Sequence, residues 1–452
     1  MKSLLAQWAC KLTKKGLRML NRGGTAFPGS VALKIDPEVL SSASKGVRTI
    51  IVTGTNGKTT TSLMIAKGME KAGYDYFANG TGANLLNGIT SAFIHNTDMM
   101  GKPLKKFAVI ECDEASLKYV APLVKPEVVV VTNLFRDQLD RYGEVMTTLS
   151  KIREALVMVP DSVLCLNGDC SLTSSLGDLP NRTYFFGMSE DFAEHDENEL
   201  SDAPRCIKCS DAYEYDYRTY GHLGSFRCPK CGYSRPQLDV YLSHMIEMNS
   251  RHTDMDVHII DHDTKVRVAL PAVYNAYNAL AAICAFKGAG LSEEAVINSL
   301  MHMRSAFGRM ENFTMGKSTA QMILVKNPAG CNQTLDYLKT LEKRYTLILI
   351  LNDGYADGKD ISWIWDSNYE KLVGNEMIEE VVVSGDRRDD MMIRIKYAGF
   401  DMNKVRECVT TTELVDVIRH SGKAVILPNY TAMLQMRHVV AEATGAKQFW
   451  EE

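Results

Sequence analysis

Four of the eleven cysteines in this 452-residue chain form two C-x-x-C pairs. Cys206 and Cys209 make the first pair, and Cys228 and Cys231 make the second after eighteen intervening residues. This spacing is typical of a structural Zn²⁺ site, in which four thiolates fill the tetrahedral shell and leave no position for substrate. Chance clustering or a redox pair is the alternative. A zinc ribbon can also bind nucleic acid, but acidic residues flank these pairs and argue against that use: Asp202, Asp211, Glu214 and Asp216.

A second motif has the composition of a phosphate-binding loop. Glycines let backbone N–H groups turn toward a phosphate, and the N-terminus of a following helix adds a positive dipole end. The spacing departs from G-x-x-x-x-G-K-[ST], because Val52 stands where the first glycine would be. A chance Gly-Lys-Thr turn fits poorly between an expected strand and an expected helix. We therefore expect the phosphates of a nucleotide to bind here, with the lysine on the β/γ-phosphates and the next threonine on Mg²⁺. The loop consists of Gly54, Thr55, Asn56, Gly57, Lys58, Thr59 and Thr60.

Carboxylates in two other parts of the chain are candidates for metal binding or for contact with a partner. Glu111 ends an apolar run and is expected to bind Mg²⁺, which prefers hard oxygen ligands; the alternative is a solubilising residue at a strand edge. Further along, residues 351–366 hold several aspartates and two tryptophans. Aspartates in such loops are usually turn or cap residues, but this density suggests a loop that faces a partner. The candidates are Asp353, Asp357, Asp360 and Asp366.

Short apolar runs alternate with helical segments around these motifs. Runs at 49–52, 107–110 and 127–131 predict a parallel sheet covered on both faces, and 275–287 predicts an alanine-rich helix. The alternation resumes at 346–350, 381–383 and 424–427. We expect an α/β protein with three parts: an N-terminal helical segment (1–44), an ATP-binding domain (45–314) with a zinc-ribbon insertion (203–236), and a C-terminal α/β domain (315–452).

Overall composition is that of an ordinary globular protein, with 45% hydrophobic and 23% charged residues. The net charge of −4 gives no basic field for nucleic acid. No apolar run is long enough to span a membrane, and the lysines within residues 1–21 argue against a secretory signal. That segment predicts an amphipathic helix packed on its own protein; the alternative is attachment to an anionic membrane surface or to a partner. Cytoplasmic localisation is the expectation.

The phosphate loop resembles that of the Mur ligase superfamily, the peptidoglycan and folate ligases that form amide bonds through acyl phosphates. This resemblance implies that Glu111 binds Mg²⁺, that Asn275 and Asn278 hold adenine, and that Arg309 faces the nucleotide. The supporting matches occur in family order: Thr132-Asn133 before Asp137-Gln-Leu-Asp140, Leu166-Asn-Gly-Asp169, Asn275-Ala-Tyr-Asn278-Ala-Leu-Ala-Ala282 and Gly308-Arg309-Met-Glu311.

Departures from the superfamily pattern narrow the resemblance. Only about 45 residues precede the first strand, too few for the UDP-recognition domain of the amino-acid-adding ligases. Gln138 replaces a histidine near the second metal, which leaves that site in question. The D-Y-A-H-N-P segment of the family appears as residues 324–330, without its Asp and His. The energy-coupling half of the pattern is retained and the amino-acid-binding half is not.

With these departures and the zinc ribbon, the sequence resembles the MurT family, the synthetase subunits of lipid II isoglutaminyl synthases. The resemblance implies that ATP–Mg²⁺ phosphorylates the α-carboxylate of D-glutamate in the lipid II stem peptide, and that ammonia displaces phosphate to give D-isoglutamine. It also implies a heterodimer with a GatD-like glutaminase, whose Cys-His pair Asp360 completes. No glutaminase nucleophile is recognisable among the other seven cysteines: Cys10, Cys112, Cys165, Cys170, Cys284, Cys331 and Cys408.

Two other readings remain open at this point. One is a self-contained Mur or folylpolyglutamate-type ligase that joins an amino acid to a carboxylate. The other is a zinc-ribbon binding module whose ATP site is vestigial.

Overall fold

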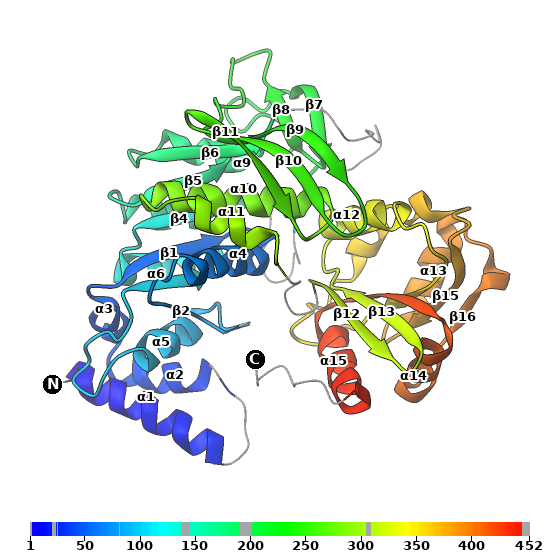
Figure 1. The fold of residues 1–452 in the computed structure, drawn as a ribbon, viewed down its shortest axis with the longest axis horizontal. Coiled ribbons are helices and arrows are strands. Elements are labelled where there is room, and N and C mark those ends of the chain that lie inside the picture. Colours follow the sequence, from blue (N-terminus) through cyan, green and yellow to red (C-terminus); the bar gives the residue numbers. More distant parts are fainter. Residues whose placement is uncertain are drawn as a thin grey trace.

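Two separate β-sheets organise the chain, one of nine strands and one of six, with a two-stranded hairpin inserted in the first part (Figure 1). The computed structural model describes residues 2–19, 24, 26–80, 82–136, 145–189, 201–303 and 309–444. The arrangement confirms the expected α/β fold class.

The nine-stranded sheet has the order β11-β10-β9-β6-β5-β4-β1-β3-β2. Neighbours from β2 to β9 run parallel, whereas β9, β10 and β11 pair antiparallel. β4 consists of four fully buried valines, as expected for a parallel strand with both faces covered. The strands are β1 (Arg48–Thr53), β2 (Tyr76–Ala78), β3 (Phe107–Glu111), β4 (Val128–Val131), β5 (Val163–Asn167), β6 (Thr183–Met188), β9 (Val240–Met248), β10 (Thr253–Ile259) and β11 (His262–Val268).

Helices cover both faces of this sheet. The chain moves outward from β1 to β2 through α4 and then reverses direction through α5, α6 and α8, so right-handed crossovers place α4 opposite the other three. α10 and α11 pack beside α4. These helices are α4 (Lys58–Lys71), α5 (Leu86–His95), α6 (Leu117–Val124), α8 (Val145–Val157), α10 (Val273–Gly288) and α11 (Glu294–Leu300), with the short α9 (Ser171–Ser174) and η1 (Ser175–Asp178) after β5.

Three N-terminal helices extend the layer that contains α5. α2 packs on α5, and α1 packs on α2 at the lower edge of the molecule (Figure 1). Their bounds are α1 (Lys2–Met19), α2 (Ala26–Ile35) and α3 (Val39–Ser44). Within the described ranges no helix is both long enough and apolar enough to cross a membrane.

The six-stranded sheet has the order β12-β13-β17-β14-β15-β16 and is parallel except for the β12–β13 pair. Its strands are β12 (Arg309–Met315), β13 (Ser318–Ile323), β14 (Tyr345–Ile350), β15 (Ile378–Ser384), β16 (Val405–Glu407) and β17 (Lys423–Pro428). Because β12 belongs to this sheet, the sheet begins at Arg309, six residues before the expected boundary at 315.

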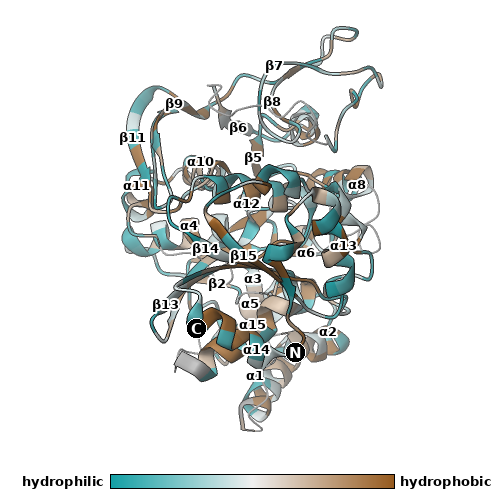
Figure 2. Ribbon diagram, turned by 90° about the vertical axis from the view of Figure 1, so that its right-hand side faces the viewer, coloured by the Kyte–Doolittle hydropathy of each residue, from teal (hydrophilic) through white to brown (hydrophobic). Residues whose placement is uncertain are grey.

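Two apolar cores lie on opposite faces of this second sheet. One contains α12 and α13, and the other contains α14 and α15. In Figure 2 brown is concentrated in the central strands of this sheet, around the label β15, whereas the outer helix α13 is mostly teal and white. The helices are α12 (Pro328–Lys339), α13 (Arg388–Ala398), α14 (Thr411–His420) and α15 (Tyr430–Thr444), with 3₁₀ turns η2 (Ser362–Asp366), η3 (Tyr369–Leu372) and η4 (Met402–Lys404).

Candidate functional site

The loop between β1 and α4 requires glycine at two positions. Gly57 precedes α4 with φ of 86°, and a Cβ added there would lie 2.2 Å from Oδ1 of Asn278. Gly54 has φ of 120°, and its added Cβ would lie 2.3 Å from Oγ1 of Thr132. Both positions combine a backbone conformation that favours glycine with a close neighbour. The loop is therefore pressed between α10 on one side and the end of β4 on the other.

Thr132 and Asn133, which follow β4, hold this loop in place. The backbone N–H of Asn56 donates to Oδ1 of Asn133 (3.0 Å). In return, Nδ2 of Asn133 (3.2 Å) and Oγ1 of Thr132 (2.7 Å) both donate to the carbonyl of Asn56. The Thr-Asn motif thus fixes the backbone of the phosphate loop.

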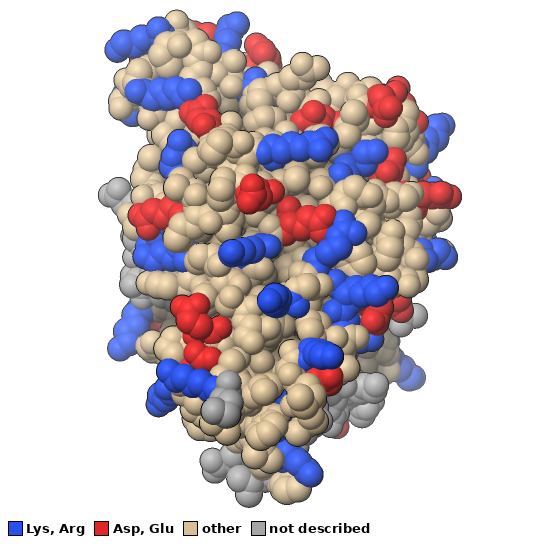
Figure 3. All heavy atoms as spheres, turned by 90° about the vertical axis from the view of Figure 1, so that its left-hand side faces the viewer, with Lys and Arg blue, Asp and Glu red and all other residues tan. Residues whose placement is uncertain are grey.

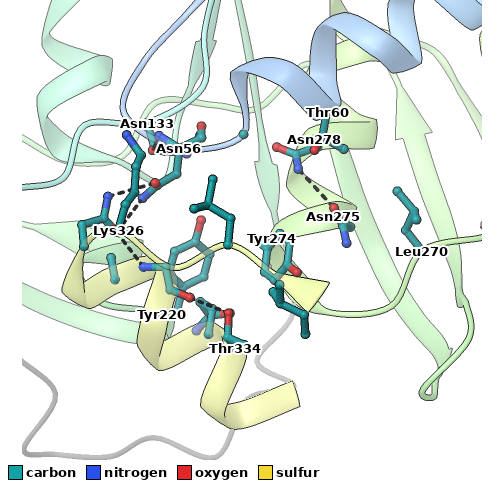
Figure 4. A pocket seen from close by; sticks show the side chains of 17 residues that line it. Asn56, Thr60, Asn133, Tyr220, Leu270, Tyr274, Asn275, Asn278, Lys326 and Thr334 are labelled. Carbon is teal, nitrogen blue, oxygen red and sulfur yellow. Dashed lines mark hydrogen bonds between the residues drawn. The ribbon is translucent and has the colours of Figure 1, made fainter. Parts of the chain in front are cut away.

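α10 brings the two predicted adenine-binding asparagines to the same place. Oδ1 of Asn278 accepts a hydrogen bond from Oγ1 of Thr61 on α4 (3.3 Å). Its Nδ2 donates to Oδ1 of Asn275 (3.3 Å), whose own Nδ2 donates to the carbonyl of Pro271 (2.6 Å). Both asparagines are buried, and both line a pocket beside the loop (Figure 4).

The opposite wall of this pocket comes from the C-terminal domain. Asn327 caps α12 by accepting from the N–H of Gly330 (2.9 Å), and its Nδ2 donates to Oδ1 of Asn56 (3.0 Å). Lys326 lies beside it, and the aromatic rings of Tyr220 and Tyr274 close other sides (Figure 4). The N-termini of α4 and α12 therefore both lie at the pocket. Such helix ends favour phosphate.

Lys58 is held inside the loop by a buried acid. Its Nζ lies 3.0 Å from Oε1 of Glu114 and also donates to the carbonyl of Gly54 (2.5 Å). Burial raises the pKa of Glu114, and the charge of Lys58 opposes that rise. The ammonium group is thus already positioned at the loop.

Glu111 lies at the same edge of the sheet as the loop. It ends β3, opposite Val52 of β1, where the carboxyl ends of parallel strands meet. Its Oε1 accepts from Nδ2 of Asn84 (3.2 Å), and Asn79 bonds its backbone N–H and carbonyl. The half-buried carboxylate has the oxygen donors that Mg²⁺ prefers.

Several predicted residues lie outside the described part of the chain. These are Asp137, Gln138 and Asp140, together with Gly308. Arg309 is described only as the first backbone position of β12, so its predicted contact with nucleotide stays a prediction.

The four cysteines of the ribbon converge at one point. All four Sγ atoms lie within 4.8 Å of one another, with 3.5 Å between Cys206 and Cys231 and 3.4 Å between Cys209 and Cys228. Zn–S bonds of about 2.3 Å correspond to tetrahedral edges of about 3.8 Å, so the four sulfurs lie near enough to one another to share one zinc ion. Two strands, β7 (Glu214–Tyr220) and β8 (Leu223–Arg227), form the rest of the ribbon.

One buried carboxylate ties the ribbon to the ATP-binding domain. Asp169 follows β5 and accepts from Nη1 of Arg235, near the end of the ribbon insertion, at 3.1 Å. It also accepts from the hydroxyl of Tyr277 on α10 at 2.7 Å. Burial raises the pKa of Asp169, whereas Arg235 lowers it. The ribbon therefore has a fixed position over α10, and Tyr220, the last residue of β7, lies in the pocket wall.

The aspartates of the 351–366 loop have different surroundings. Asp353 pairs with Arg387 (3.3 Å) and Asp366 with Arg136 (3.0 Å). Asp357 is buried and accepts from the N–H of Thr431 (2.8 Å).

The surroundings of Asp360 differ from those of the other three aspartates. Its carboxylate is only half buried and accepts from the N–H of Ser362 (2.9 Å). The hydroxyl and N–H of Ser362 hold the pKa of Asp360 below its usual range, so this carboxylate is ionised at neutral pH.

Arg136 connects this loop to the other two parts of the site. Its Nη2 pairs with Asp366, and its Nε and backbone N–H donate to the carboxylate of Asp202 before the ribbon (3.2 and 2.9 Å). Arg136 itself follows the segment that supports the phosphate loop.

Sequence comparisons match this arrangement part by part. The Mur ligase middle domain matches residues 52–222, and the MurT ligase C-terminal family matches residues 324–433. The lipid II isoglutaminyl synthase (glutamine-hydrolyzing) subunit MurT of Streptococcus pneumoniae is 33% identical over 428 residues, covering 94% of each chain. The subunit of the same name from Staphylococcus aureus is 34% identical over 437 residues, covering 96% of this chain and 97% of its own.

The chain belongs to the MurT family. Solved structures support the Mur ligase fold. A pseudomurein peptide ligase type C from Methanothermus fervidus has a TM-score of 0.67 at 19% identity, covering 88% of this chain and 79% of that one. MurF ligase from Thermotoga maritima in complex with ADP has a TM-score of 0.61 at 12% identity, covering 89% and 81%. The MurT C-terminal match begins at residue 324, beside the pocket wall formed by Lys326 and Asn327.

Proposed function

We propose that this chain is the synthetase subunit of a lipid II isoglutaminyl synthase, an ATP-dependent carbon–nitrogen ligase of peptidoglycan synthesis. The observation that carries the proposal is the similarity over nearly the whole of two curated MurT subunits. The site supports it, because the phosphate loop and the asparagines of α10 line one pocket, and Glu111 ends the strand next to the one that leads into that loop.

ATP is the proposed phosphate donor. Its phosphates would lie against the loop 54–60, with Lys58 on the β/γ-phosphates and Asn275 and Asn278 near adenine. Thr59 and Glu111 would hold Mg²⁺, which neutralises phosphate charge when bound. Arg309 is proposed to face the nucleotide.

The proposed substrate group is the α-carboxylate of D-glutamate in the lipid II stem peptide. A carboxylate is a poor electrophile because oxide is a poor leaving group. Transfer of the γ-phosphoryl group of ATP to the carboxylate oxygen gives an acyl phosphate. Ammonia then attacks the carbonyl carbon, the C–O bond to phosphate breaks, and one proton leaves the nitrogen to give D-isoglutamine.

Ammonia is proposed to come from a separate glutaminase, because the relatives are named as subunits of a glutamine-hydrolyzing enzyme. The C-terminal domain, residues 315–452, would contact this GatD-like partner in a heterodimer. Asp360 would complete the partner's Cys-His pair by fixing the histidine tautomer and stabilising its cation. Its ionised, half-buried carboxylate supports this role more than the paired Asp353 or the buried Asp357.

Zinc is proposed as a structural ion of the ribbon, and cytoplasmic localisation follows from the proposed substrate chemistry. Lipid II is membrane-linked, so we place the reaction at the inner face of the membrane.

A pair of lysine variants tests the proposed reaction. Lys58→Ala should abolish ATP- and glutamine-dependent amidation of lipid II by the complex, because a phosphate contact is lost. Lys67→Ala is the matched control on the exposed side of α4, where the lysine forms an ion pair with Glu70 (2.7 Å). Unchanged amidation by Lys58→Ala would exclude the loop assignment. Activity of the isolated chain with an amino acid would favour a self-contained ligase.

A further inference from the structure

Helix α1 presents apolar side chains to solvent along one stripe. Leu5, Trp8, Leu12 and Met19 are 56%, 40%, 69% and 75% exposed. Their spacing of three, four and seven residues keeps them on one side of the helix. The usual surface helix turns such a stripe toward the core. The inner face of α1 is instead formed by small or polar residues: Ala6, Gln7 and Cys10.

The orientation of α1 is fixed by polar contacts with the loop that follows α5. Nε1 of Trp8 donates to the carbonyl of Met99 (2.9 Å), and Nζ of Lys11 donates to the carbonyl of Asp98 (2.7 Å). The hydroxyl of Thr97 donates to Oε1 of Gln7 (3.0 Å). The helix therefore cannot bury its apolar stripe by rotating without losing these bonds.

The same loop extends the apolar surface. Met99, Met100 and Leu104 are 63%, 69% and 57% exposed. We call these three residues, together with Leu5, Trp8, Leu12 and Met19, the N-terminal apolar face. Contiguous exposed apolar patches of this kind mark interaction sites.

The charged side chains described on α1 are all basic. No acidic residue occurs before Asp36, and Lys2 and Lys15 are exposed on α1 beside the apolar stripe. Figure 3 shows a tan surface with blue side chains at the lower end of the molecule, the end that carries α1 in Figure 1. Lysine is depleted at protein–protein interfaces, whereas lysine beside leucine and tryptophan is typical of helices on anionic bilayers.

We propose that the N-terminal apolar face binds the surface of a bilayer containing anionic lipid. The leucines and methionines would enter the boundary between headgroups and acyl chains, Trp8 would lie at headgroup depth, and the lysines would contact anionic headgroups. This inference deepens the proposed function, since it brings the enzyme to a lipid-linked substrate. Its evidence, the orientation of α1, is independent of that function.

Vesicle flotation of the full chain tests the proposal without ATP or lipid II. The wild-type chain should float with vesicles of phosphatidylcholine containing about one third phosphatidylglycerol, and less with phosphatidylcholine alone. Leu5→Ser with Leu12→Ser should weaken binding by about tenfold or more, because two inserted side chains are lost. The matched control is Val157→Ser with Met158→Ser, which changes two exposed apolar residues (58% and 48%) at and just after the end of α8 and should float like the wild type.

Two results would overturn the proposal: a wild-type chain that does not float, or a Leu5/Leu12 variant that floats as well as the control. Loss of glutaminase binding by that variant in size-exclusion chromatography, with flotation retained, would assign the face to a protein instead. Amidation of detergent-solubilised lipid II reports on the proposed function separately. The variant should retain this activity, so failure of the reaction and failure of membrane binding are distinguishable.

Discussion

Gly57 offers the sharpest test of the nucleotide pocket, because the chain contains a matched glycine elsewhere. Gly46 has the same φ of 86° but no atom within 4 Å of an added Cβ. Alanine at either position carries the strain of a left-handed residue, about 1–2 kcal/mol. Only at Gly57 would the new Cβ also lie 2.2 Å from Oδ1 of Asn278.

The close approach of an added Cβ at Gly57 to Asn278 predicts a loss of affinity for ATP. Asn278 is buried and bonded to Thr61 and Asn275. Moving its amide sacrifices two hydrogen bonds of about 1 kcal/mol each, or else the loop shifts away from its phosphate-binding position. Either change should weaken ATP binding by about tenfold or more, which corresponds to about 1.4 kcal/mol.

Calorimetric titration with ATP–Mg²⁺ and thermal melting of both variants separate the two effects. Both variants should melt a few degrees below the wild type, at roughly 2–4 °C per kcal/mol. Gly46→Ala should bind ATP with the affinity of the wild type, whereas Gly57→Ala should bind it about tenfold or more weakly. Equal ATP affinity of the two variants would refute the assignment of Asn278 and the loop to one nucleotide site.

Three further predictions concern the other parts of the site. Cys209→Ser should reduce zinc, measured by mass spectrometry of the metal, from one per chain to near none; full retention would exclude the four-thiolate site. Asp360→Asn should lower glutamine hydrolysis by the complex about a hundredfold or more while ATP binding persists, whereas Asp353→Asn should have little effect; the reverse order would assign the partner's triad to Asp353. Arg136→Ala should reduce amidation with glutamine as the nitrogen source more than amidation with added ammonium. The reason is that Arg136 joins the 351–366 loop, which contains Asp360, to the segment that supports the phosphate loop. Equal losses from both nitrogen sources would contradict that link.

Parallel strands and their helices could be predicted because their signals are local. The valine run of β4 and the glycine-rich turn before α4 each identify an element without knowledge of its neighbours. The antiparallel strands β9 to β11 were not predicted. A usable signal is present in the sequence of β10, where apolar Met255, Val257 and Ile259 alternate with polar residues in the period of a strand.

Site residues that arise from long-range packing were beyond local patterns. Tyr220 lies in the pocket wall because Asp169 ties the ribbon to α10 and because its ring packs on Phe135 and Tyr277. Glu114 meets Lys58 because β1 pairs with β3. The sequence also left several aspartates as candidates for the partner-facing carboxylate. Their different surroundings, which favour Asp360, depend on Arg387 and Thr431 from distant parts of the chain.

The central claim is that the chain amidates lipid II in an ATP-dependent reaction with ammonia supplied by a partner. Mass spectrometry of lipid II tests this claim most directly. The chain would be co-purified with a GatD-like glutaminase and incubated with lipid II, ATP–Mg²⁺ and glutamine. We predict exchange of one hydroxyl for an amino group on the D-glutamate of the stem peptide, dependent on ATP, glutamine and both subunits. Lipid II that remains unchanged under these conditions, with both subunits folded and associated, would contradict the account.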